Sequence, residues 1–199
     1  MAIYIIIAVI LVVVTGFFFA FPSPKKTLQK PTFTTTNQGG EPEKIENRYY
    51  DLRKMALKIT PDLVGGQSTG RATKVFGIVM DWDTGEGTVT VVAFQNGDAS
   101  MYVSSGGGII GGAQYRKVRK AVRSFVELGQ DYIGKAEKTT TTLLPDRHNV
   151  GFYLLTNKGT FHAQEEWKAI EYGNSDWRPL FNEANKVLER LRQISEKKS

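Results

Sequence analysis

The distribution of apolar residues divides the chain into three parts. Residues 2–21 (AIYIIIAVILVVVTGFFFAF) are apolar throughout and contain no Lys, Arg, Asp or Glu. Residues 22–42 show no apolar period and are rich in Pro, Thr, Gly and Lys. After residue 42, apolar positions recur with the steps of helices and strands. The pattern predicts a membrane anchor over 1–21, a flexible linker over 22–42 and one folded domain over 43–199.

The opening run has the length of a membrane span. A helix of this length rises about 30 Å, which matches the hydrocarbon core of a bilayer. Pro22 and Pro24 end it, because neither has an N–H to continue the helix. A cleaved signal peptide is the alternative, but the run lacks a preceding basic region and is longer than the usual apolar core of about 7–15 residues. We therefore expect a retained, single-pass signal-anchor of bacterial type.

The charges beside the anchor predict its orientation. Lys25, Lys26 and Lys30 follow the span, and no basic side chain precedes it. The positive-inside bias then places the folded domain in the cytoplasm, beside the inner leaflet. The chain has no cysteine, which fits a reducing compartment and excludes disulfides, thiolate nucleophiles and cysteine metal sites.

Helical and strand patterns alternate within the folded domain. Apolar residues at three- and four-residue steps predict helices over 43–59, 113–128 and 176–195. In the first helix, the apolar face comprises Ile45, Tyr49, Leu52, Met55 and Ile59. β-Branched and apolar runs predict six strands, over 74–82, 88–94, 99–104, 139–144, 150–156 and 160–164.

Turn signals join these strands into hairpins. Asn96-Gly97 is the strongest such signal, and Asn157-Lys158-Gly159 joins the last two strands. The order of elements predicts an α+β fold. Its antiparallel sheet would have five or six strands, in the sequence meander, helix, strands, helix, with helices mainly on one face.

The two halves of the domain resemble each other in pattern. An offset of 62 residues places Gly97 on Gly159 and Val118 on Leu180. Residues 74–128 and 139–195 would each be three strands and a helix, so an internal duplication is one hypothesis. Two convergent hairpin-helix units are the plainer alternative.

A glycine-rich run is the sharpest local motif. Residues 106–111 (GGGIIG) match the pattern G-x-G-x-x-G between a strand and a helix. Glycines let backbone amides approach a phosphate, and a helix N-terminus favours an anion. The candidate ligand-binding residues are Gly106, Gly107, Gly108, Gly111, Arg116 and Lys117. A structural turn or a mobile loop is the alternative, since the preceding strands are hairpin-linked and no acidic ribose ligand follows.

Other candidate sites are weaker. Asp81-Trp82-Asp83-Thr84 resembles the D-x-D-x-T element of haloacid-dehalogenase-like phosphotransferases over four residues, which implies a carboxylate nucleophile and acid/base pair. The following antiparallel hairpin instead favours an acidic turn. The two histidines, His148 and His162, match no compact metal motif. A nucleophilic Ser104 or Ser105 has no assigned base. We predict no catalytic residue, no metal and no cofactor.

Charge gives the broadest signal of function. The chain carries a formal net charge of +6, and basic residues concentrate over 113–138. Membrane-surface candidates are Lys25, Lys26, Lys30, Arg119, Lys120 and Arg123. We expect a non-enzymatic binding or adaptor domain that faces the inner leaflet and meets a protein partner or a second copy of itself. A domain that binds a phosphorylated ligand at residues 106–112 is the alternative, and nucleic acid is disfavoured as a partner.

Overall fold

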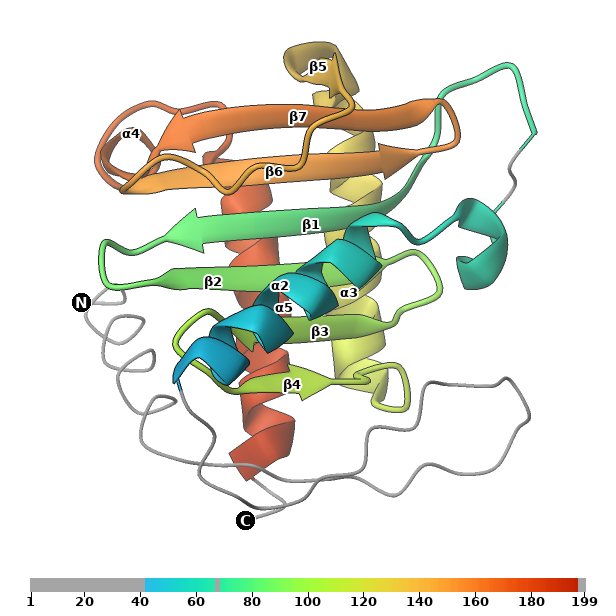
Figure 1. Ribbon diagram of the computed structural model, residues 1–199. Coiled ribbons are helices and arrows are strands. Elements are labelled where there is room, and N and C mark those ends of the chain that lie inside the picture. Colours follow the sequence, from blue (N-terminus) through green and yellow to red (C-terminus); the bar gives the residue numbers. More distant parts are fainter. Residues whose placement is uncertain (1–41, 67–68, 197–199) are drawn as a thin grey trace.

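The computed structural model describes residues 42–66 and 69–196 as a seven-stranded sheet with helices on both faces (Figure 1). The predicted anchor and the linker up to residue 41 lie outside the described residues. Within the described ranges, no helix has the length and apolar character needed to cross a bilayer.

All neighbouring strands of the sheet are antiparallel. Their order is β4-β3-β2-β1-β6-β7-β5, so β1 and β6 bring the two halves of the chain together at the centre. The strands are β1 (Val75–Asp83), β2 (Thr88–Phe94), β3 (Ala99–Val103), β4 (Gly108–Ile110), β5 (Glu137–Thr139), β6 (Asn149–Thr156) and β7 (Gly159–Glu166).

Two long helices cover one face of the sheet. They are α3 (Arg116–Gly129) and α5 (Arg178–Glu196), and they pack against each other and on strands β1 to β3. The main core lies between these helices and the sheet, with Ile78, Phe125 and Leu180 fully buried. The short helices η2 (Gln130–Lys135) and α4 (Trp167–Glu171) extend this layer at Tyr132 and Ile170.

The other face is covered by α2 (Pro42–Leu57), which crosses the sheet obliquely in Figure 1. The 3-10 helix η1 (Pro61–Val64) follows it. Tyr49 and Ala56 of α2 pack with Val64, Tyr102 and Tyr153 in a second, smaller core. The central strands are therefore buried on both faces, and β1, β2 and β3 are buried at nearly every position.

The predicted α+β class and the antiparallel sheet are confirmed, but the strand count is wrong. The sheet has seven strands. The prediction missed β4, which lies inside the glycine-rich run. The predicted strand over 139–144 does not form, because β5 ends at Thr139 and residues 140–148 form an irregular segment.

The first helix differs from its predicted apolar face. Met55 was expected on the buried side, yet its side chain is 45 % exposed. Arg53 takes the inward position instead and is only 5 % exposed. A charged side chain is buried only when partners satisfy it, so this exchange points to a polar site beneath α2.

The two halves of the domain place their strands differently. The offset of 62 residues aligns β1 with the region of β5 and β2 with β6. In the sheet, β1 pairs with β2, whereas β5 pairs with β7. The duplication thus stays a hypothesis.

Candidate functional site

The glycine-rich run forms a turn and an edge strand. Gly106 and Gly107 adopt positive φ angles of 111° and 88°, which glycine accommodates without strain. Gly108–Ile110 then pairs with β3 as β4. The N–H of Gly106 donates to the Val103 carbonyl, and the N–H groups of Gly111 and Gly112 both donate to the Ala99 carbonyl. These amides therefore hold the sheet edge together.

Five of the predicted basic residues lie on α3, which begins just after this edge strand, and the other three (Lys25, Lys26 and Lys30) lie outside the described residues. Arg119 is half-buried, and its guanidinium donates to the carbonyl of Ala113 at 2.6 Å. The exposed members are Arg116, Lys117, Lys120 and Arg123. No ion pair found within residues 42–66 and 69–196 involves a residue of α3. The exposed basic side chains of this helix thus lie outside the ion pairs of the described part of the chain.

A buried ion pair beneath α2 is the feature that sequence analysis missed. Nε and Nη2 of Arg53 donate to Oδ2 of Asp81 at 3.0 and 2.6 Å. Asp81 lies in β1, two residues before its end, and is 0 % exposed. Its other oxygen, Oδ1, accepts the Thr90 hydroxyl hydrogen at 2.6 Å. Because that hydroxyl has a single hydrogen, Tyr49 must be the donor in its 2.8 Å contact with Thr90.

Arg53 also holds the irregular segment that precedes β6. Its Nη1 donates to the Thr142 carbonyl at 2.7 Å, and Nη2 donates to the Leu143 carbonyl at 3.1 Å. The hydroxyl of Tyr153 donates to the same Leu143 carbonyl. One guanidinium therefore joins α2, the sheet and residues 140–148. Burial opposes its charge, but the hydrogen bonds and the charge of Asp81 outweigh burial and raise the pKa of Arg53.

His162 lies at the border of this network. Its ring stacks on Tyr153 with a centroid distance of 4.4 Å, and its Nε2 is buried without a hydrogen-bond partner among the described atoms. Burial lowers the pKa of His162. The charge of Asp81 raises this pKa by a smaller amount, and the charge of Arg53 lowers it again. Burial also raises the pKa values of Tyr49 and Tyr153. Burial thus favours the neutral forms of His162, Tyr49 and Tyr153, and Arg53 is paired with Asp81. This arrangement suits a structural role.

His148, the second histidine, lies in the loop directly before β6. His148 has a φ of 62°, the only positive value at a non-glycine residue in the described part of the chain. Its N–H donates to Oδ1 of Asp83 at 3.0 Å, and the same oxygen accepts the N–H of Gly85 at 2.9 Å. Asp83 thus fastens the loop before β6 to the β1–β2 turn.

Residues of the weaker candidate sites make hydrogen bonds within the domain. Both carboxylate oxygens of Asp81 accept hydrogen bonds inside the sheet, from Arg53 and Thr90, whereas Asp83 lies at the β1–β2 turn. Ser104 accepts the N–H of Thr88 through its hydroxyl oxygen. Over residues 42–66 and 69–196, no three His, Cys, Asp or Glu side chains come together as a metal site.

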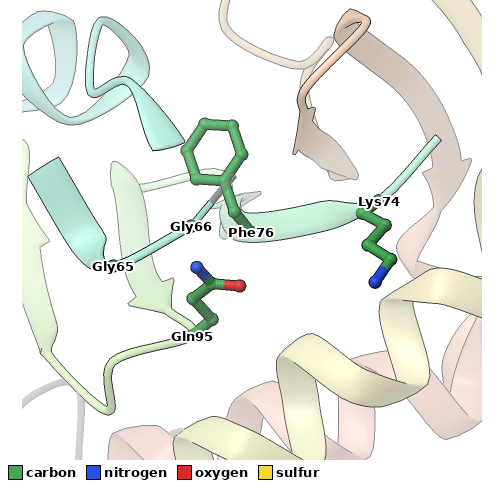
Figure 2. A pocket seen from close by; sticks show the side chains of 5 residues that line it. All are labelled: Gly65, Gly66, Lys74, Phe76 and Gln95. Carbon is green, nitrogen blue, oxygen red and sulfur yellow. The ribbon is translucent and has the colours of Figure 1, made fainter. Parts of the chain in front are cut away.

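A pocket of about 230 Å³ opens beside η1, lined by Gly65, Gly66, Lys74, Phe76 and Gln95 (Figure 2). The side-chain amide of Gln95 lies between the two glycines and Lys74, and it donates to the Val64 carbonyl at 3.4 Å. Small-molecule sites usually enclose about 300–1,000 Å³ and converge several polar groups. This pocket has neither the size nor the polar convergence of such a site.

Comparison of the chain with protein-family models, with curated proteins and with solved structures finds no significant match.

Proposed function

We propose that this protein is a membrane-anchored, non-enzymatic binding domain whose basic helical surface faces the anionic inner leaflet. The observation that carries the proposal is the exposed charge of α3. Arg116, Lys117, Lys120 and Arg123 are exposed, and Glu127 is the first acidic residue of the helix. Each basic residue near an anionic leaflet contributes about 1 kcal/mol.

The buried titratable groups support a binding role over a catalytic one. Arg53 and Asp81 neutralise each other inside the domain, and Thr90 and Tyr49 complete their hydrogen bonds. Such a network of mutually paired groups stabilises a scaffold. The surface, with its unpaired basic residues, is then the part of the domain that meets a partner.

The predicted linker lets this surface reach the bilayer. Although α2 begins the domain on the opposite face from α3, about twenty linker residues have a root-mean-square span of about 25 Å. That span is comparable to the thickness of a helix–sheet–helix sandwich whose layers are each about 10 Å across. Tethering also raises the local concentration of the domain at the membrane, so individually weak contacts suffice.

Site-specific labelling tests this orientation directly. The chain has no cysteine, so Gln114→Cys beside α3 and Lys54→Cys on α2 each introduce one label site. Both positions are exposed. Gln114 lies two residues before α3 and Lys54 lies on α2, and these two helices cover opposite faces of the sheet. The full-length chain is reconstituted in nanodiscs containing a lipid-headgroup quencher. We expect stronger quenching at residue 114 than at residue 54 in anionic discs, and equal, weak quenching in neutral discs.

Salt and charge reversal complete the test. At about 1 M salt the Debye length falls to about 3 Å, and the difference between the two labels should disappear. Lys120→Glu with Arg123→Glu should abolish it at low salt, whereas Arg48→Glu with Lys58→Glu, the matched control at α2, should leave it. Equal quenching at both sites in anionic discs would overturn the proposal.

A further inference from the structure

The edge strand β4 leaves backbone hydrogen-bonding groups facing outward. The Gly107 carbonyl accepts from the N–H of Val103, and the N–H of Gly111 donates to the Ala99 carbonyl, each at 3.2 Å. Residues 107, 109 and 111 thus bond toward β3. Because these directions alternate along a strand, the N–H and C=O groups of Gly108 and Ile110 face away from the sheet. In the described part of the chain, no strand lies on that side.

The two edges of the sheet differ in chemistry. The opposite edge, β5, carries Glu137 and Lys138, which are the charges that usually discourage pairing with another strand. By contrast, β4 is Gly-Ile-Ile, without a charge or a proline, and the side chain of Ile110 is 56 % exposed. The β4 edge therefore lacks the charged side chains that protect β5.

Basic side chains border the β4 edge. A Cβ placed on Gly112 would lie 2.5 Å from Val118 of α3 and 3.0 Å from Leu191 of α5. The first turn of α3 and the last turns of α5 therefore meet just beyond β4. Arg116 and Lys117 are exposed there, and Arg190 is half-buried on α5.

We propose that the β4 edge binds an extended acidic segment of a partner protein as an additional strand. The outward groups of Gly108 and Ile110 would pair with the backbone of the segment. Alternate side chains would be acidic, toward Arg116 and Lys117, and apolar, beside Ile110. A second copy of this chain fits less well, because edge-to-edge pairing brings the two sets of basic residues together. The assignment rests on the proposed binding role, though not on the leaflet contact.

Peptide binding in neutral detergent tests this assignment without any anionic lipid. The probe is a fluorescein-labelled peptide of alternating Glu and Val, and its control alternates Lys and Val. Fluorescence anisotropy with the full-length chain should show saturable binding of the acidic probe and none of the basic one. Mass photometry on the same samples measures the oligomeric state.

Three variants separate the backbone contribution from the charge contribution. Ile110→Pro removes one outward N–H and spares the bonds to β3, so affinity should fall by about tenfold or more. Ile110→Val, the matched control, keeps that N–H and should stay within about twofold. Arg116→Glu with Lys117→Glu leaves the edge intact and should weaken the acidic probe by a similar factor to the proline variant.

The outcomes decide the assignment. No binding of the acidic probe, equal binding of both probes, or an unchanged affinity after the charge reversal would overturn it. A dimer that Ile110→Pro dissolves would assign the edge to a second copy. If Ile110→Pro fails to fold, the charge-reversal variant alone decides. A positive peptide result combined with failed leaflet labelling would retain the edge site and reject the membrane-facing surface.

Discussion

Arg53 and Asp81 form a buried ion pair across 28 positions of sequence, with a shortest contact of 2.6 Å between Nη2 and Oδ2. The pair joins the helix that follows the predicted linker to the central strand of the sheet. Through the carbonyls of Thr142 and Leu143 it also fixes the segment before β6. The attachment of α2 to the sheet therefore depends on a polar contact as well as on apolar packing.

Removing one member of this pair should destabilise the domain strongly. Arg53→Met leaves the Asp81 carboxyl buried without its cation, and Asp81→Leu leaves the Arg53 guanidinium buried without its anion. Each should lower the free energy of unfolding by about 3–5 kcal/mol. Urea unfolding of the full-length chain in detergent measures this, and all three tryptophans (Trp82, Trp167 and Trp177) lie in the domain and report on it alone.

The double variant provides the control for that prediction. Arg53→Met with Asp81→Leu removes both charges together and should recover most of the loss, because no unpaired charge stays buried. Additive losses in the double variant would show that the charges are not coupled, contrary to the geometry.

Acid should weaken the domain through His162. Burial lowers the pKa of its imidazole below the ordinary value of 6.5, so the unfolded chain takes up the proton first as the pH falls. The stability that neutral His162 contributes is complete above pH 6.5 and is lost as the pH falls toward the folded-state pKa. The free energy of unfolding should decrease over this range of pH.

A matched pair of variants isolates this effect. His162→Phe keeps a ring that can stack on Tyr153 but cannot titrate, and it should flatten the pH dependence between about pH 7.5 and pH 5.5. His148→Gln, at the exposed histidine, is the comparison variant. An equal slope in wild type and His162→Phe would contradict the assignment.

Gly85→Ala should destabilise the β1–β2 turn for two reasons. Gly85 has a φ of 88°, and an added Cβ would lie 2.3 Å from Cε1 of His148. The backbone conformation alone costs about 1–2 kcal/mol for an alanine, and displacing the ring adds to it. Urea unfolding of the variant measures the sum.

A second substitution separates these two costs. His148→Gly removes the ring and relieves the positive φ of 62° at that position. In this background, Gly85→Ala should cost only the backbone contribution, and a double-mutant cycle gives the difference. If the cost is the same in both backgrounds, the contact between the two loops has no energetic role.

Local patterns were sufficient to predict most of the fold. The buried runs of β1, β2 and β6 are long and β-branched, and α3 and α5 have clear apolar stripes, so residues close in sequence determine them. The failed strand over 139–144 shows the limit of this reasoning. Its Thr142 and Leu143 carbonyls bond to Arg53, about 90 positions away, and no local pattern reports such a contact.

The candidate site was less accessible to sequence reasoning. One signal existed: Asp81 stands inside the apolar strand GIVMDW, where an unpaired carboxylate could not be buried. Arg53 lies four residues after Tyr49 on the inward side of its helix, yet nothing in the sequence indicates that these two charges meet. Likewise, β4 has only three residues, too few for a period.

We propose that this domain works at a membrane surface to which residues 2–21 hold it. The most direct measurement is the intact mass of the chain recovered from membranes of its native host after a carbonate wash. We predict a carbonate-resistant protein whose mass includes residues 2–21. A mature chain that begins beyond Pro22, or a chain released into the carbonate supernatant, would contradict the account.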